Sequence, residues 1–497
     1  MNVVETITNV NSAINGVVWG VPMLVLIIGT GVLMTTLTGF FQIRKFGHTI
    51  SETIGGLFKE ESDVNDKSEK HSISQFQSLC TALAATIGTG NIAGVAAAIA
   101  AGGPGAVFWM WLSAFFGMMT NYSENVLGIY YRRKNPEGEW SGGAMYYLRD
   151  GLGGMPGMKT VGIILAGLFS VFCVLASFGI GNMSQINSIA TNMDEVFGIP
   201  RLATGIILMI MAGLVVVGGI KRIASVTEHL VPFMALTYVV LSLIVFFVNI
   251  GRVGEVFSAI FSFAFGIRAI GGAAVGLAVK NAATWGLKRG VFSNEAGLGS
   301  SVMVHSASNV KEPVVQGLWG IFEVFADTIV VCTLTAFAIL SSGIIDLQTG
   351  EVLSANEKTA LVSEAFGRVF NIGSLNIGGI FVAIAILLFA FSTVLGWSYY
   401  GTKGFEYLFG TKATIIYKVA FVIVIVFGAT MELDLAWDIS DTFNGLMALP
   451  NLIGVVALSG VVMKITQNYC KRKFEGGTDE PMLSAFEDVQ KEQMEKL

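Results

Sequence analysis

Two long apolar stretches of this chain are interrupted by the same short motif. Residues 90–94 read Gly-Asn-Ile-Ala-Gly inside the stretch 76–101, and residues 293–297 read Ser-Asn-Glu-Ala-Gly inside the stretch 272–307. Both contain Asn-x-Ala-Gly, and each is followed by another apolar segment. Paired hydrophobic segments broken by glycine in the two halves of a chain are typical of the binding site of a secondary transporter. The motif therefore predicts a transporter whose binding site lies where two broken helices meet.

The composition indicates a membrane protein. Of the 497 residues, 53% are apolar and only 13% are charged. Apolar runs of about 18 or more residues recur, and each is long enough to cross ~30 Å of hydrocarbon as one helix. A membrane β-barrel would instead show alternating segments of about ten residues. We therefore expect an all-α polytopic membrane protein.

Hydropathy along the chain predicts eleven transmembrane helices. They lie at 17–41, 77–101, 105–130, 159–187, 202–219, 229–250, 272–306, 313–341, 375–400, 413–430 and 443–463. If the second and seventh helices correspond, helices 2–6 and 7–11 form two repeats of five, the second inverted in the membrane. We expect a single transporter domain over 1–497, which comprises an accessory first helix at 17–41, a first repeat at 77–250, a second repeat at 272–463 and a tail at 464–497.

The Lys and Arg residues predict the orientation. With the N-terminus outside, 22 of them, Lys70 included, fall on the inner side in loops and in the tail. Those on the outer side are only Arg201, Arg252, Arg268, Lys358 and Arg368. Because cytoplasmic loops carry the excess of basic residues, the N-terminus is predicted outside and the C-terminus in the cytoplasm. We expect a multi-pass protein of the plasma (inner) membrane.

The first break, at residues 86–91, offers backbone groups for binding. Gly88 and Gly90 flank Thr89, and each glycine costs about 1 kcal/mol relative to alanine inside a helix. An opened helix frees carbonyls that can bind Na⁺ and N–H groups that can hold a carboxylate. The alternative is that these glycines serve helix packing alone. The stretch also fits G-x-G-x-x-A, but it follows an apolar helix rather than a strand, which excludes a dinucleotide site.

The second break lies in residues 285–300, which contain several glycines and ionisable groups. Ionisable groups at membrane depth face a cavity or one another. We expect Lys288, Arg289 and Glu295 to pair with acidic residues of neighbouring helices, namely Glu124, Glu323 and Asp327. For Lys288 and Arg289 a structural charge network is favoured over a role in binding. Asn294 and the backbone beside it are predicted site residues.

Two further polar patches interrupt apolar helices. One is the glycine-rich run 178–185, and the other contains the adjacent hydroxyls of Ser392 and Thr393. These hydroxyls could complete an oxygen shell around Na⁺. The alternative is that each donates back to the carbonyl four residues earlier, which is common in membrane helices.

The chain carries no catalytic constellation. The four histidines are isolated, and no Ser/His/Asp, HExxH or Walker arrangement is present in a supporting context. The four cysteines are scattered and are predicted to be free thiols. We therefore expect no enzyme activity, no cofactor and no nucleic-acid partner, and the sequence carries no pattern that predicts an oligomeric state.

Three long motifs resemble a known family. They are residues 103–111 (GPGAVFWMW), 288–297 (KRGVFSNEAG) and 392–401 (STVLGWSYYG), read together with Gly88-Thr89-Gly90-Asn91. The chain resembles the alanine or glycine:cation symporters, the sodium:alanine symporter family, over nearly its whole length. The resemblance implies a LeuT-type fold of two inverted five-helix repeats and uptake of alanine or glycine driven by Na⁺.

The resemblance also implies roles for particular residues. Backbone amides near Thr89 and Gly90 would hold the substrate carboxylate, with Asn91 beside them. Carbonyls of Ala84 and Ile87, with the hydroxyls of Ser392 and Thr393, would form one Na⁺ site. Thr86 and Asn91 match the place of a second Na⁺ site in some relatives. The looser candidates for the pocket wall are Phe178, Gly179, Asn182, Phe292, Asn294 and Trp397.

The predicted function is thus sodium-coupled symport of small neutral amino acids by alternating access, with alanine or glycine, Na⁺ and the lipid bilayer as partners. One alternative is a proton-coupled amino-acid transporter, with Glu124 or Glu295 in the pocket. A channel is a further alternative, but broken helices in two inverted halves favour alternating access over a continuous pore.

Overall fold

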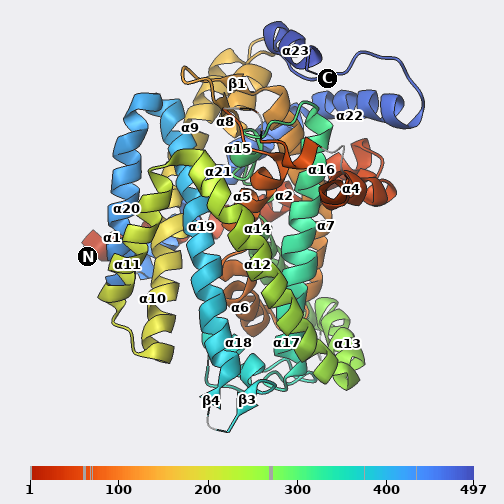
Figure 1. The fold of residues 1–497 in the computed structure, drawn as a ribbon. Helices are drawn as coiled ribbons and strands as arrows, with labels where there is room; N and C mark the ends of the chain where they lie inside the picture. The colour runs from red at the N-terminus through yellow and green to blue at the C-terminus, as the bar shows by residue number, and fades with distance from the viewer. Residues whose placement is uncertain are drawn as a thin grey trace.

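The computed structural model describes residues 3–59, 63–67, 69, 71–267, 272–356, 358–373, 375–431 and 434–496. Over these ranges the chain is mostly helical, with two short antiparallel hairpins (Figure 1). Lys70 and Arg268, which count in the predicted orientation, lie outside the described residues.

Two apolar helices, α1 (Val3–Val18) and α2 (Val21–Leu37), precede the first broken helix. They lead into short elements near one end of the molecule, namely α3 (Phe41–Arg44), α4 (Phe46–Glu52) and the 3₁₀ turns η1 (Ile54–Phe58) and η2 (Asp63–Asn65).

The next stretch contains the first broken helix and the helices that follow it. Its elements are α5 (Gln75–Thr86), η3 (Thr89–Asn91), α6 (Ala93–Gly102), α7 (Ala106–Tyr130), β1 (Arg133–Lys134), β2 (Trp140–Ser141), α8 (Ala144–Tyr146), η4 (Tyr147–Leu152), α9 (Lys159–Phe178), η5 (Gly179–Met183), α10 (Ser184–Phe197), α11 (Arg201–Val216), α12 (Gly219–Val248), η6 (Ile250–Arg252) and α13 (Val253–Ala264). In the hairpin, Arg133 lies opposite Ser141.

The rest of the chain begins with the second broken helix. Its elements are α14 (Gly272–Asn294), α15 (Val302–His305), α16 (Pro313–Val324), η7 (Phe325–Cys332), α17 (Thr333–Ser341), α18 (Lys358–Gly367), β3 (Asn371–Ile372), β4 (Leu375–Asn376), α19 (Ile377–Phe409), η8 (Thr411–Ala413), α20 (Thr414–Thr430), α21 (Asp434–Ala457), α22 (Ser459–Phe474) and α23 (Glu487–Met494). Figure 1 shows α6, α18 and the β3–β4 hairpin toward one end, and α22 and α23 at the other.

Six helices in the described ranges are long and apolar enough to cross a membrane, or eight spans if each of two bent pairs counts as one. The bent pairs are α5 with α6, at 59°, and α21 with α22, at 57°. The prediction of a helical membrane protein is confirmed, whereas the count of eleven crossing helices stays a prediction.

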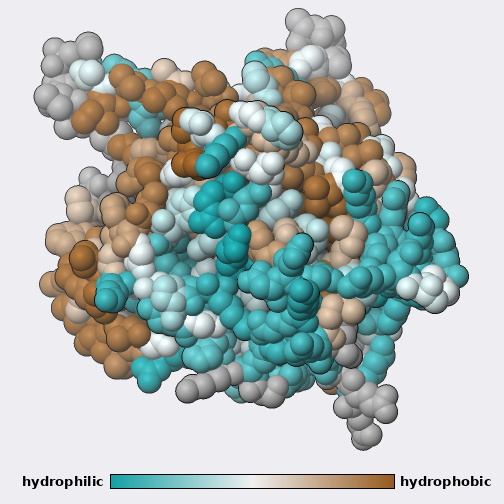
Figure 2. All heavy atoms as spheres, turned by 90° about the horizontal axis from the view of Figure 1, so that it is seen from above, coloured by the Kyte–Doolittle hydropathy of each residue, from teal (hydrophilic) through white to brown (hydrophobic). Residues whose placement is uncertain are grey.

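Large apolar side chains on the outer helices point away from the protein. Leu214 of α11, Phe233 and Leu236 of α12 and Ile416 of α20 are each more than 60% exposed. Seen from the end that carries α23, hydrophilic residues fill the middle of the face and hydrophobic residues gather along much of its margin (Figure 2). This distribution is that of a protein whose sides contact lipid and whose ends contact water.

Three segments contain π-helical turns, of which one lies between the predicted helices 105–130 and 159–187 and two lie inside the predicted helices 159–187 and 313–341. They are η4, η5 and η7. Because π-turns leave little trace in hydropathy, the sequence did not predict them, and they occur frequently at functional sites.

Gly396 of α19 allows α19 to lie directly against α5. A Cβ atom added at Gly396 would lie 2.7 Å from Cβ of Ala85 and 3.0 Å from its Cα. Small residues at such crossings let helix backbones approach in membranes.

We expect Gly396→Ala to lower the thermal unfolding temperature of the purified protein, because the added methyl overpacks this crossing at a cost of about 1–3 kcal/mol. Gly167→Ala in α9 is the matched control, since nothing lies within 4 Å of the Cβ it adds. Thermal unfolding in detergent measures both variants. Equal unfolding temperatures for the two would contradict the close approach of α5 and α19.

Candidate functional site

The first break separates α5 from α6 and is closed by one asparagine. α5 ends at Thr86, Gly88 is extended, and η3 follows. The backbone N–H of Gly88 donates to Oδ1 of Asn91 at 2.9 Å. Asn91 therefore takes a donor that the broken helix leaves without a helical partner.

The second break lies between α14 and α15. Glu295 has a φ of +54°, a left-handed conformation that is uncommon for a residue other than glycine, and Gly297 follows with +94°. The backbone N–H of Ala296 donates to Oδ1 of Asn294 at 3.1 Å. Both predicted breaks are confirmed. Each asparagine of the repeated motif accepts from a backbone N–H of its own break, Asn91 from the residue three before it and Asn294 from the residue two after it.

A single carboxylate joins the two breaks. Asp327, fully buried on η7, accepts from Nδ2 of Asn91 at 2.6 Å with one oxygen. With the other oxygen it accepts from the hydroxyls of Ser293 at 2.8 Å and Thr328 at 2.7 Å. The Thr328 hydroxyl in turn accepts from Nδ2 of Asn294 at 3.1 Å. Asp327 is therefore hydrogen-bonded to both broken helices.

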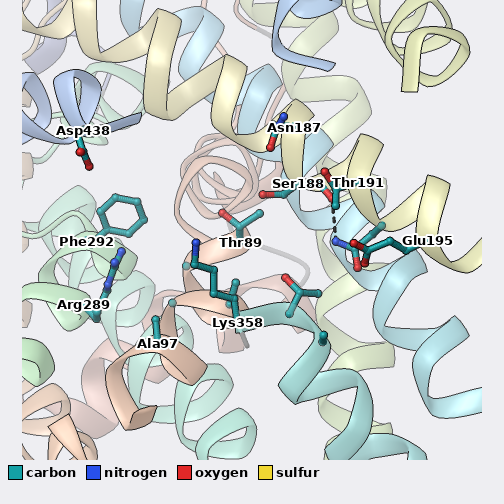
Figure 3. A pocket seen from close by; sticks show the side chains of 16 residues that line it. Thr89, Ala97, Asn187, Ser188, Thr191, Glu195, Arg289, Phe292, Lys358 and Asp438 are labelled. Carbon is teal, nitrogen blue, oxygen red and sulfur yellow. Dashed lines mark hydrogen bonds between the residues drawn. The ribbon is translucent and has the colours of Figure 1, made fainter. Parts of the chain in front are cut away.

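A cavity of about 630 Å³ lies beside the first break (Figure 3). Its walls come from the first break (Thr89, Gly90), from α6, α10 and α18, and from Arg289 and Phe292 of α14. The Thr89 hydroxyl donates to Oε1 of Gln185 at 3.0 Å. A Cβ atom added at Gly90 would lie 3.4 Å from the ring of Phe292, so glycine leaves the backbone open to the cavity there.

Charged groups of both signs surround this cavity. Arg289 and Lys358 carry positive charge, and Glu195 and Asp438 carry negative charge, on walls that face one another in Figure 3. A polar lining with balanced charges suits a zwitterion better than an ion of one sign.

The predicted pairing of the α14 charges is wrong for Lys288. Its Nζ lies 2.9 Å from Asp441 of α21, and Asp441 also accepts from Asn15 of α1 at 3.1 Å. Glu295 instead accepts from the Ser300 hydroxyl at 2.5 Å. The reason is the direction of the side chain: Nζ of Lys288 projects toward Asp441 and lies 5.3 Å from the centre of the Trp19 ring.

The other acidic residues of the expected network have neutral partners or a histidine. Glu124 accepts from Asn451 at 2.5 Å, and Glu323 lies 2.9 Å from Nε2 of His305. All of these carboxyl groups are buried.

The structure also brings together the residues predicted for one ion site. The Ser392 hydroxyl lies 3.2 Å from the carbonyl oxygen of Ala84 and donates to the carbonyl of Phe389 at 2.8 Å. The Thr393 hydroxyl donates to the same carbonyl at 3.0 Å and lies 2.5 Å from the Cβ position of Gly88. A hydroxyl that donates to a carbonyl keeps lone pairs for a cation, so back-bonding and ion binding are compatible here.

Ile87 and Thr86 lie next to this group. Ile87 is buried at the C-terminal end of α5, and its N–H donates to the carbonyl of Leu83 at 2.8 Å. The Thr86 hydroxyl donates to the carbonyl of Ala82 at 3.3 Å. Asn91, which was also predicted for a second ion site, is held by Gly88 and Asp327.

Of the six looser candidates for the pocket wall, only Phe292 lines the cavity. Asn294 is buried in the network of Asp327. The Phe178 ring lies 5.2 Å from that of Tyr417 on α20, and Asn182 donates to the carbonyl of Phe421 at 2.7 Å.

The last two wall candidates also lie away from the cavity. Trp397 is 2% exposed and packs beside Gly181, and Gly179 faces Ser440 of α21. These contacts place the run 178–182 against α19, α20 and α21.

Sequence reasoning missed the polar face of α10. Gln185 contacts Thr89, and Asn187, Ser188 and Thr191 line the cavity. These residues, with Asn192 and Glu195, recur at intervals of one to three along α10, a pattern that the sequence contains.

Comparisons with known proteins place the chain in one family of transporters. The model of the sodium:alanine symporter family matches residues 4–484. The sodium/alanine symporter AgcS of Methanococcus maripaludis is 46% identical over 458 residues, covering 92% of this chain and 96% of that protein. The amino-acid carrier protein AlsT of Bacillus subtilis is 34% identical over 457 residues, covering 91% of this chain and 90% of that protein.

Solved structures show a similar fold. MhsT in complex with L-phenylalanine has a TM-score of 0.52 at 13% identity, covering 80% of this chain and 99% of MhsT. The nucleobase-cation symporter Mhp1 has a TM-score of 0.50 at 14% identity, covering 88% of this chain and all of Mhp1. Since the family model and both relatives span nearly the whole chain, the protein belongs to the sodium:alanine symporter family.

Proposed function

We propose that this protein imports alanine, and also glycine, together with Na⁺ across the plasma membrane by alternating access. Membership of the sodium:alanine symporter family supports cation-coupled symport of alanine. The observation that supports Na⁺ coupling and small substrates is a cavity at the first helix break, which α14 also lines just before the second break, with the hydroxyls of Ser392 and Thr393 beside the first break.

The substrate is proposed to bind at Thr89 and Gly90. Both residues line the cavity at a break whose N–H groups lack regular helical partners, and such groups favour a carboxylate. The cavity is much larger than a three-carbon amino acid, so we assign the rest of it to the path from solvent. Phe292 beside Gly90 would bound the space for the side chain, which favours small substrates.

Na⁺ is proposed to bind between α5 and α19, at the carbonyls of Ala84 and Ile87 and the hydroxyls of Ser392 and Thr393. The 3.2 Å separation of Ser392 Oγ and the Ala84 carbonyl supports this assignment, since a hard cation prefers such oxygens. An ion there would connect the broken helix to an unbroken one. Its inward gradient and the membrane potential, worth about 2.3 kcal/mol per charge per 100 mV, would drive uptake.

The architecture proposed for this mechanism has eleven spans, with inverted repeats at 77–250 and 272–463 after an accessory first helix, within one domain. The Asn-x-Ala-Gly motif, which occurs at both breaks, supports the repeat. The excess of Lys and Arg on the face of the C-terminal tail supports an outside N-terminus and a cytoplasmic C-terminus.

Proton coupling is the second candidate, because Glu124 and Glu295 are buried among membrane helices without a basic partner in the described residues. Such carboxyl groups are typical of proton pathways in transporters. A pH gradient in place of the Na⁺ gradient separates the two candidates.

We expect Thr393→Ala to lower the apparent affinity for Na⁺ about tenfold, which corresponds to ~1.4 kcal/mol, because it removes one oxygen from the proposed ion site. The measurement is uptake of labelled L-alanine into proteoliposomes over a range of inward Na⁺ gradients, with choline as the control. Thr402→Ala is the matched variant, since its hydroxyl also donates to the carbonyl four residues earlier on α19. An equal loss in both variants would overturn the ion site. Uptake driven by a pH gradient alone would move the coupling to protons.

We expect Gly90→Ala to raise KM for alanine about tenfold, because the new methyl would fill the space between the break and Phe292. Gly94→Ala should change KM little, since Gly94 lines the same cavity but its Cβ position has no neighbour closer than 4.0 Å. Concentration series of labelled alanine uptake measure both. If Gly94→Ala raises KM as strongly as Gly90→Ala does, the substrate does not bind at Gly90.

We expect Asp327→Ala to abolish uptake and to lower the unfolding temperature, because it removes the carboxyl group that accepts from three buried donors, at about 1–3 kcal/mol for each donor left unsatisfied. Asp327→Asn should retain part of the uptake and part of the thermal stability, since its amide oxygen can still accept hydrogen bonds. Uptake and thermal unfolding are measured on the same preparations. Normal uptake by Asp327→Ala would show that transport does not depend on the link between the breaks.

A further inference from the structure

We propose that the C-terminal residues 480–496, here called the C-terminal strap, hold closed the end of the transporter opposite α18 and loosen when that end opens. The inference rests on the proposed alternating access and concerns its regulation. In Figure 1 the strap, with α23, lies at the end of the molecule far from α6 and α18.

The strap has a fixed shape of its own. Oε1 of Gln490 accepts from the N–H groups of Leu483 at 2.8 Å and Ser484 at 3.0 Å, and its Nε2 donates to the carbonyl of Pro481 at 2.7 Å. Leu483 is only 2% exposed. The strap is therefore ordered by these hydrogen bonds together with apolar contacts, since Met482 and Phe486 pack against the hydrophobic core.

One set of contacts ties the strap to the end of α7. The N–H of Ala485 donates to the carbonyl of Tyr130 at 2.9 Å. The guanidinium of Arg133 lies 3.4 Å from the centre of the Phe486 ring. Lys134 pairs with Glu492 at 2.5 Å.

A second set ties the strap to the segments that lead into α5 and out of α15. Lys496 pairs with Glu69 at 2.8 Å, a few residues before α5 begins. Lys311, which follows α15, donates to the carbonyl of Lys496.

The two segments that the strap contacts also contact each other. The N–H of Ile73 donates to the carbonyl of Ala307 at 3.1 Å, and the N–H of Asn309 donates to the carbonyl of Ile73 at 2.9 Å. These backbone hydrogen bonds therefore hold α5, which is one half of the first broken helix, beside α15, which is one half of the second.

Release of substrate at the end that carries the strap requires α5 and α15 to separate. The strap contacts three segments that would have to move relative to one another, namely those at Glu69, Tyr130 and Lys311. Its ion pairs are partly exposed, and such pairs are individually weak and screened by salt. Contacts of this kind suit a latch that must open and close in every transport cycle.

The test is hydrogen exchange on the full-length protein in nanodiscs at low salt, without substrate. The backbone amides of Ile73 and Asn309 are the reporters, because both are hydrogen-bonded across the segments that must part. Two variants loosen the strap at different places: Phe486→Ala at the end of α7 and Lys496→Ala at Glu69. Lys491→Ala on the exposed side of α23 is the control for loss of a positive charge.

We expect exchange at both reporters to rise about two- to fivefold in Phe486→Ala and in Lys496→Ala, as the loss of one weak contact would give, and to stay unchanged in Lys491→Ala. In the wild type, added salt should raise exchange in the same way. If Phe486→Ala speeds exchange only within 483–494 and leaves both reporters unchanged, the strap covers the surface and latches nothing.

This exchange measurement does not depend on transport. A wild-type protein that fails to accumulate alanine while its reporters respond to strap variants would overturn the proposed function and leave the latch standing. Accumulation of alanine by a wild-type protein whose reporters do not respond to the strap variants would overturn the latch and leave the proposed function standing.

Discussion

The buried carboxylate of Asp327 is the interaction on which the rest of this structure depends. Breaking two helices at membrane depth exposes backbone groups that lipid cannot hydrogen-bond, so each break must be satisfied by protein. The two asparagine caps satisfy the amides nearest each break, and Asp327 then fixes both breaks through Asn91 and Ser293. Removing water from a carboxylate is costly unless several donors replace it, and three donors do so here.

This arrangement explains why the motif occurs twice. In each copy the asparagine supplies an oxygen to the backbone of its own break and an amide group to the shared network around η7. The glycine-rich backbone beside it leaves room for close neighbours, such as Phe292 beside Gly90. The two broken helices are thereby connected through hydrogen bonds to one buried carboxyl group, and such bonds are stronger in a site of low dielectric.

Sequence patterns predicted the parts of the molecule that depend on local chemistry. The helical membrane architecture and both breaks follow from hydropathy and glycine positions, whereas the neighbourhood of Ala84, Ser392 and Thr393 was implied by the family resemblance. The partner of Lys288 and the role of Asp327 could not be predicted in this way, because they depend on which faces of distant helices meet. The π-turn at η7 is part of the reason: it shifts the residues after it around the helix axis, so regular spacing along this span misplaces its side chains.

The two ends of the molecule are built from different kinds of contact, and this difference fits alternating access. The polar cavity lies at the end that carries α18. The opposite end is closed by polar groups such as Arg132, whose buried guanidinium donates to the carbonyls of Ser306, Ser308 and Val310. Between the ends, α7 and α16 pack through glycines such as Gly317, where a Cβ atom would lie 2.7 Å from the Tyr122 ring. Tightly packed helices resist deformation and move as units, while hydrogen bonds and ion pairs at an end can be exchanged for water at little net cost. The closed end can therefore open without loss of the helix packing that holds Asp327 and both breaks in place.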